Sequence, residues 1–207
     1  AQATRRLHCG GSKTFIDVGL RSSFNASTIM TSEGRLIFFR GPEGDSLLNT
    51  WLDDQRRRCA PVSDTGFPLH QDPRLVLHAG QMYVSSCGDF LAPDFRTGIG
   101  LRPIYFQGRE LDFGRGWRWD TIHDWLDYPR PRVEKNWIPF SDPTGFYYVY
   151  SIQPHRILKI DTATGRVSLA HDTTAPSLPW QVVEGTDLRG SAQPVRLGDG
   201  SYLSTFH

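Results

Sequence analysis

Bulky apolar side chains gather in short runs along this chain rather than on helical faces. The runs RLIFF at 35–39, MYV at 82–84 and FYYVY at 146–150 are rich in β-branched and aromatic residues, and a glycine turn precedes each. Such runs are typical of buried β-strands. The best helix candidate, residues 45–57, is equally compatible with a strand and a turn. We therefore predict an all-β protein with little helix.

One pattern, a glycine turn followed by an apolar strand, recurs four times. Its copies are EGRLIFFR at 33–40, AGQMYVSS at 79–86, TGFYYVYS at 144–151 and DGSYLSTF at 199–206. Their glycines are separated by 46, 65 and 55 residues, which is the size of a four-stranded propeller blade with variable loops. Outer strands are expected within residues 101–111 and 156–170. The repeat therefore predicts a β-propeller.

A polar residue opens a second strand upstream of each glycine turn. These openings are Asn25, Asp72, residues 135–137 and residues 190–191. The innermost strand of each propeller blade begins near the central axis, so these polar starts would line a shared funnel. The alternative is a set of capped strand ends in an unrelated sandwich, whose strands usually recur every 8 to 12 residues without this longer period.

The repeat also sets the expected domain limits. Residues 1–22 form an N-terminal extension, and residues 23–207 form a partial propeller domain with blades starting near 25, 72, 135 and 190. The fourth blade reaches only its second strand at His207. Because an open sheet edge would otherwise stay unpaired, a further segment or a partner chain is expected to complete the propeller.

Composition and charge narrow the classes of partner. The 207 residues are 38% hydrophobic and carry a net charge of +1, so there is no electrostatic argument for nucleic acid or an anionic membrane. No apolar stretch approaches the roughly 18 residues of a membrane span. The opening Ala-Gln-Ala slightly favours a secretory or extracellular location, which otherwise stays open.

Cysteine and histidine spacing gives no reason to expect a metal or an organic cofactor. Cys9, Cys59 and Cys87 are an odd number without a C-x-x-C pair, which argues against a structural zinc site and a dense disulfide framework. One disulfide and one free thiol remain an option. No glycine-rich segment resembles a nucleotide cradle.

Four segments together resemble a known family. They are SFNAS with GRLIFFR, QDPRL with GQMYVS, EKNWIPF with FYYVYSIQPHRIL, and RGSAQPVRLGDGSYLSTFH. In order and spacing these resemble the blade motifs of the five-bladed propellers of glycoside hydrolase family 130, the β-mannoside phosphorylases and hydrolases, and their eukaryotic relatives. The resemblance runs from Ser23 to His207 but covers only the first three to four blades.

The resemblance assigns the catalytic acid to Asp72. The family's acid is the aspartate of a Glu-Asp-Pro-Arg motif, which falls on the QDPR segment here, with Gln71 in place of the usual glutamate. A carboxyl group deep in a funnel loses water, which favours the protonated form that acid catalysis needs. The alternative is an Asp-Pro strand opening with Arg74 paired nearby.

The resemblance also implies a set of binding residues. Asn25 and Arg40 match sugar- and anion-contacting residues of the first blade, although Asn25-Ala-Ser is also a glycosylation sequon that should be unused if Asn25 faces the funnel. Lys135 and His155 match residues that bind phosphate, a co-substrate of phosphorylase members. The alternatives are a Lys135–Glu134 pair and a hairpin cap at His155. The remaining assigned substrate-binding residues are Arg74, Asn136, Trp137 and His207.

Other arginines and tryptophans leave alternatives open. The two arginines that complete a phosphate site have no clear match among Arg102, Arg109, Arg115, Arg118, Arg130 and Arg132, so hydrolysis or transfer from an activated sugar stays open beside phosphorolysis. Aromatic faces stack on sugar rings, but tryptophans also pack between blades. Packing is favoured for Trp117, Trp119 and Trp125, and Trp137 is open between the two.

Two functions from different classes follow. The first is a carbohydrate-active enzyme that performs inverting phosphorolysis, hydrolysis or transfer on β-mannoside-like oligosaccharides, with Asp72 as general acid. The second is a non-catalytic propeller that binds glycan or serves as a structural module in a larger assembly. Gln71 and the incomplete blades favour the second, and the set of site residues favours the first.

Overall fold

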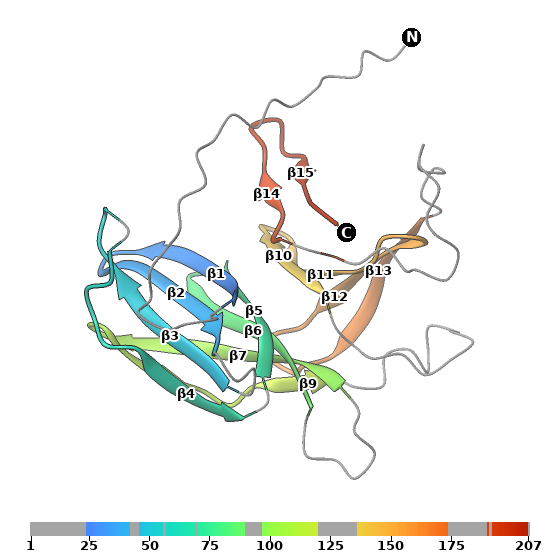
Figure 1. Ribbon diagram of the computed structural model, residues 1–207. Coiled ribbons are helices and arrows are strands. Elements are labelled where there is room, and N and C mark those ends of the chain that lie inside the picture. The colour runs from blue at the N-terminus through green and yellow to red at the C-terminus, as the bar shows by residue number, and fades with distance from the viewer. Residues whose placement is uncertain are drawn as a thin grey trace.

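The computed structural model describes residues 24–41, 46–55, 57–68, 70–89, 97–119, 136–173, 190 and 192–206 (Figure 1). Regular structure within these residues consists of antiparallel β-strands without a helix. The prediction of an all-β protein is confirmed. Residues 1–22, expected as an extension, lie outside the described residues, so that domain limit stays a prediction.

The first sheet is a four-stranded meander in chain order. Its strands are β1 (Phe24–Thr31), β2 (Gly34–Arg40), β3 (Ser46–Leu52) and β4 (Ser63–Pro68). Residues 46–52 of the helix candidate form β3, whose neighbours are β2 and β4. Buried residues occupy both faces of this strand, which is why its apolar positions do not alternate and can be read as helical.

The second sheet has the same strand order, except that two short strands share the place of the fourth strand. It contains β5 (His70–His78), β6 (Gln81–Asp89), β7 (Thr97–Gln107), β8 (Glu110–Phe113) and β9 (Trp117–Trp119). The C-terminal part of β7 pairs with β8 and its N-terminal part pairs with β9. The expected outer strand at 101–111 therefore corresponds to β7 and the start of β8.

The third sheet is again a four-stranded meander, and a hairpin follows it. The sheet contains β10 (Ile138–Asp142), β11 (Gly145–Ser151), β12 (His155–Ile160) and β13 (Val167–Thr173). The expected strand pair at 156–170 is β12 and β13, joined through Thr164-Gly165. The hairpin contains β14 (Val195–Arg196) and β15 (Tyr202–Leu203).

The repeated glycines all lie at the first hairpin of a sheet. Gly34, Gly80, Gly145 and Gly200 stand at the β1–β2, β5–β6, β10–β11 and β14–β15 connections, respectively. At the β5–β6 turn, Ala79 and Gly80 both have positive φ, 48° and 80°, which is the conformation of a type I′ turn. The predicted internal repeat is therefore present as repeated first hairpins.

Alternating side chains of each sheet build two interfaces. Leu36 and Phe38 of the first sheet pack with Leu75, Val84 and Ile104 of the second. The opposite face of the second sheet packs against the third, and the residues of this second core include Cys87, Ile99, Leu101, Trp119, Trp137, Phe146, Tyr148 and Leu158. The second sheet thus lies between the other two (Figure 1).

The first strands of the three sheets lie beside one another. Contacts join β1 to β5 and β5 to β10. Near the glycine turns, the Nδ1 of His78 in β5 lies 2.8 Å from the Oγ of Ser141 in β10. Both residues stand near the ends of their strands, so β5 and β10 run in the same direction, with their starts on one side of the molecule.

Candidate functional site

Strand register places several of the predicted residues at the same end of their sheets. Arg40, the last residue of β2, pairs with Phe24 at the start of β1, next to Asn25. Arg40 is half-buried. The side chain of Asn25 is outside the described part of the structure, so its direction toward or away from a ligand stays a prediction.

Asp72 lies in a bulge at the start of β5. The register with β6 shifts between Gln71 and Arg74, and Asp72 has a φ of 51°. Aspartate tolerates this left-handed conformation better than most residues, although it still costs free energy. Its half-buried carboxylate accepts a long hydrogen bond from the Cys87 thiol, with Sγ and Oδ2 3.8 Å apart. Asp72 therefore lies outside the regular backbone pairing of β5 with β6.

Arg74 folds back on the same bulge. Its Nη1 donates to the backbone oxygens of Asp72 and Pro73, at 3.4 and 3.3 Å. Its Nε is buried and has no hydrogen-bond partner in the described structure. Loss of water lowers the pKa of Arg74, an effect that Asp72 and Cys87 oppose. A half-buried cationic side chain with an unsatisfied Nε thus stands two residues from the predicted acid.

Asn136 and Trp137 lie immediately before β10, and Lys135 is outside the described residues. Asn136 is half-buried with a φ of 60°. Trp137 is only 2% exposed. Its ring stacks on Trp119 with centroids 6.2 Å apart and meets Tyr148 and Tyr150 edge-on. Ring contacts of this kind pack Trp137 into the core between the second and third sheets.

His155 begins β12 at the same end of the third sheet as Asn136. It is half-buried, pairs with Thr173 in β13, and its backbone oxygen accepts a hydrogen bond from the Thr173 hydroxyl at 3.4 Å. His207 lies outside the described residues. Its neighbour Phe206 forms an antiparallel bridge with Gly190, so the chain approaches that same side again.

Two residues that the motif reading missed hold the inner strands together. The Ser27 hydroxyl accepts a 2.9 Å hydrogen bond from Leu75 N and donates to Gln193 Oε1 at 3.3 Å. The Nε2 of Gln193 donates to the backbone oxygen of Leu75. Ser27 and Gln193 each follow a polar start by two or three positions. That spacing is the signal that could have identified them.

Gly190 allows the hairpin to approach the third sheet. A Cβ at this position would lie 2.6 Å from the backbone oxygen of Asn136 and closer still to the Ile138 side chain. The fourth polar start therefore lies directly against the third. Together with the Ser27 contacts, this brings the starts of β1, β5 and β10 and the Gly190 segment into one neighbourhood.

Tryptophans in β9 join the second and third sheets. Trp117 Nε1 donates to Thr162 O at 3.1 Å, and Trp119 Nε1 donates to Gly165 O at 3.0 Å. Both acceptors lie in the β12–β13 turn. These two indoles therefore pack between sheets, as the sequence reading favoured. Trp125 lies outside the described residues.

Neither of the described cysteines forms a disulfide, and Cys59 lies at the surface while Cys87 lies in the interior. Across the described ranges, no group of three or more His, Cys, Asp or Glu side chains is placed to hold a metal ion. The same ranges contain no helix whose length and apolar character would let it cross a bilayer.

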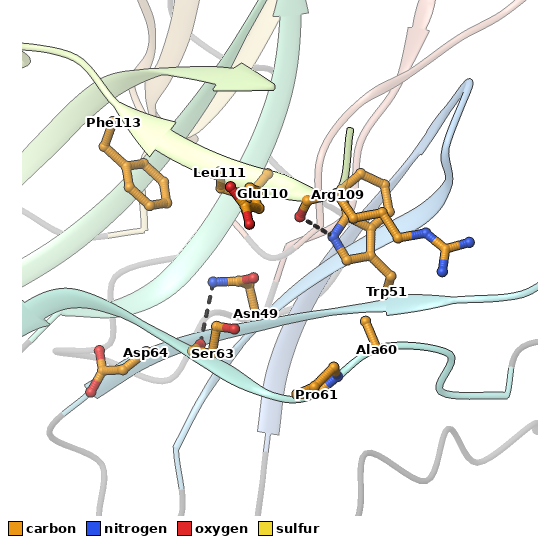
Figure 2. A pocket seen from close by; sticks show the side chains of 10 residues that line it. All are labelled: Asn49, Trp51, Ala60, Pro61, Ser63, Asp64, Arg109, Glu110, Leu111 and Phe113. Carbon is orange, nitrogen blue, oxygen red and sulfur yellow. Dashed lines mark hydrogen bonds between the residues drawn. The ribbon is translucent and has the colours of Figure 1, made fainter. Parts of the chain in front are cut away.

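A cavity of about 470 Å³ lies apart from this neighbourhood (Figure 2). Its walls come from β3, β4, the segment around Ala60 and the start of β8. Since β5 and β8 lie at opposite edges of the second sheet, the cavity is remote from Asp72.

Comparison with known proteins finds a partial similarity to glycan-modifying enzymes. No protein-family model matches the chain. Over 80 residues it is 30% identical to β-mannosyltransferase 2 from each of two strains of Komagataella phaffii. The match covers 37% of this chain and 12% of the length of those relatives, so the chain spans a small part of the proteins it resembles.

Proposed function

We propose that this chain belongs to a protein that transfers β-mannosyl groups to a glycan acceptor, with the reaction site at the start of β5. The observation that carries the proposal is the 30% identity over 80 residues to β-mannosyltransferase 2. The earlier resemblance to β-mannoside phosphorylases points to the same sugar and favours an inverting reaction.

The proposed scaffold is a five-bladed propeller of which the chain supplies three full blades and the first hairpin of a fourth. Three consecutive antiparallel sheets, two of four strands and one of five, with neighbouring first strands support this architecture. The hairpin exposes Val195 at 61% and Leu203 at 44%. Further strands, from elsewhere in the whole protein or from a partner chain, would cover these apolar side chains.

The proposed chemistry uses the Asp72 carboxylate as the proton acceptor in the transfer direction. The acceptor hydroxyl loses its proton to Asp72 as its oxygen attacks the anomeric carbon of the donor. The bond from that carbon to the donor phosphate oxygen breaks, and the configuration inverts. In the reverse direction the protonated Asp72 donates to the glycosidic oxygen, which is the acid role expected from the motif.

Arg74 is the proposed partner of the donor phosphate. The half-buried guanidinium lies beside Asp72, and its buried Nε has no hydrogen-bond partner in the described structure. Phosphate oxygens accept charge-assisted hydrogen bonds from arginine particularly well. Asn25, Arg40, Lys135, Asn136, Trp137, His155 and His207 remain proposed sugar- or phosphate-binding residues.

A second candidate function is glycan binding without chemistry. Gln71 in place of the family's glutamate favours it, because a charge beside the proposed acid is missing. The stacking of Trp137 on Trp119 also favours it, because in this alternative the ring serves the core and not a reacting sugar.

The test is mannosyl transfer to a β-linked mannotriose by the full-length protein. Mannose 1-phosphate and GDP-mannose are supplied as donors in separate reactions, and the product is analysed by mass and anomeric configuration. Asp72→Asn should reduce transfer by about 100-fold or more, the scale of a lost acid–base group. Asp54→Asn, the same change at an exposed turn residue, should leave the rate unchanged.

The outcomes separate the two candidates. Use of either donor by the wild-type protein, with loss in Asp72→Asn, supports the enzyme and identifies the donor class. Binding of the mannotriose without transfer from either donor would establish the non-catalytic alternative. Equal rates for Asp72→Asn and the wild type would remove Asp72 from the mechanism.

A further inference from the structure

The cavity between the outer strands of the first two sheets has the size of a small-ligand site. Its volume is about 470 Å³, within the range of roughly 300 to 1,000 Å³ that is usual for such sites. One wall is formed by β3 and β4 and the facing wall by the start of β8 (Figure 2).

The apolar part of the cavity is built from side chains that the core already fixes. Trp51 is 2% exposed, and its indole nitrogen donates to the Arg109 backbone oxygen at 2.9 Å. Phe113 packs edge-on against Phe38, with ring centroids 6.2 Å apart. Since the hydrogen bond of Trp51 and the ring contact of Phe113 fix both side chains, the surface that they present to the cavity is preformed.

The polar part offers more hydrogen-bond acceptors than donors. Asn49 is 5% exposed, and its Nδ2 donates to Ser63 O at 3.3 Å, which orients the amide. Figure 2 shows Asn49 and Glu110 pointing toward one another from opposite walls. Asp64 adds a second carboxylate to the lining. The nearby cation, Arg109, donates away from the cavity to the backbone oxygens of Glu33 and Cys59.

We propose that this cavity binds one sugar unit of a neutral glycan, at a site separate from Asp72. Several hydroxyl groups on a ring with an apolar face match acceptors opposite a preformed apolar wall. Two carboxylates disfavour an anionic ligand by like-charge repulsion. The choice of a sugar over another neutral hydroxyl-rich molecule rests on the proposed function, and the cavity would hold a part of the glycan that does not react.

The experiment locates binding directly on the full-length protein. Hydrogen–deuterium exchange is followed by mass spectrometry with and without a β-linked mannotriose, and again with spermidine as a cationic probe. The mannotriose should protect residues 46–64 and 109–113. Transfer activity is measured in parallel, so that protection at the cavity and reaction at Asp72 are scored separately.

Two variants test the lining without disturbing the core. Glu110 and Ser63 are exposed strand residues whose side chains make no hydrogen bond in the described structure. Glu110→Gln keeps the shape and removes the charge. The affinity for the mannotriose, obtained from exchange protection at increasing mannotriose concentration, should fall about tenfold. Ser63→Tyr should fill the cavity and abolish protection there. Glu33→Gln, the same chemical change outside the cavity, should bind like the wild type.

Each result decides the proposal. Protection of 46–64 and 109–113 by the mannotriose, lost in Ser63→Tyr and kept in Glu33→Gln, supports it, with or without measurable transfer. Transfer by the wild type without such protection would overturn the cavity proposal and leave the proposed function standing. Protection by spermidine alone would overturn it in favour of a cation site.

Discussion

The backbone N–H of Leu75 donates a 2.9 Å hydrogen bond to the Oγ of Ser27, 48 positions earlier in the chain. This bond connects the first strands of two separate sheets, and Gln193 completes it by bonding to both residues. Ser27 is 7% exposed and Leu75 is 2% exposed, so water cannot easily replace the hydrogen bond between them. The geometry of the proposed site depends on this connection because Asp72 lies three residues before Leu75.

Replacing Ser27 with alanine should destabilise the protein. The substitution leaves the buried Leu75 N–H without its acceptor, at a cost of about 1–3 kcal/mol in the free energy of unfolding. Urea denaturation of the full-length protein measures it, with the exposed turn substitution Ser32→Ala as control. If Ser27→Ala and Ser32→Ala unfold at the same urea concentration, the bond has no role in stability. Because Ser27 and Gln193 share one network, the effects of Ser27→Ala and Gln193→Ala should be less than additive.

Adding a methyl group at Gly190 should push the β14–β15 hairpin away from the third sheet. The new Cβ would overlap the Asn136 backbone oxygen and the Ile138 side chain. Overpacking of this kind costs about 1–3 kcal/mol. Thermal unfolding of Gly190→Ala is compared with Gly198→Ala, where a Cβ meets no atom within 4 Å. Equal melting temperatures for the two variants would contradict the close approach.

The β5–β6 turn should become more stable when Ala79 is changed to asparagine. Ala79 has a φ of 48°, and Asn-Gly is the preferred pair for a type I′ turn. The expected gain in the free energy of unfolding is about 0.5–1 kcal/mol, the scale of left-handed strain at a non-glycine residue. Ala163→Asn is the control, since this exposed turn alanine does not have positive φ. A gain in both variants would point to a cause other than φ.

Acid should weaken two of the turns. Hydrogen bonds from the Thr164 hydroxyl and the Ser201 hydroxyl hold the pKa values of Asp161 and Asp199 below their ordinary 3.8. The stability that these carboxylates contribute is present above that ordinary value and is lost as the pH falls through the lower folded-state pKa values. The double variant Asp161→Asn/Asp199→Asn should therefore lose less stability than the wild type between pH 5 and pH 2. Identical profiles for the double variant and the wild type would refute the assignment.

The repeat was the part of the fold that sequence could predict. Gly80 and Gly200 stand in turns with φ values of 80° and 84°, which glycine adopts without strain, and the strands beside them keep a recognisable composition. The spacing between turns then set the size of each sheet. Local chemistry of this kind is visible in one segment at a time, so the all-β prediction was correct.

Contacts between sheets could not be predicted in the same way. The segment 45–57 was ambiguous because β3 is buried on both faces, which removes the alternation that marks a half-buried strand. The hydrogen bonds described above for Ser27, Gln193 and Asn49 are made to partners in other strands or sheets, which a single segment does not reveal. The assignment of ligands to Asn25, Arg40 and His155 stays a prediction, because pairing register explains their places without a bound sugar.

The stacked indoles of Trp119 and Trp137 come from the second and third sheets, with their planes only 17° apart. Two chromophores held this close couple electronically, and the coupling disappears as soon as the sheets separate. Circular dichroism in the tryptophan region should therefore report the docking of these sheets independently of their strand content. The chain thus carries its own spectroscopic probe for intermediates in which the sheets are formed but not yet assembled.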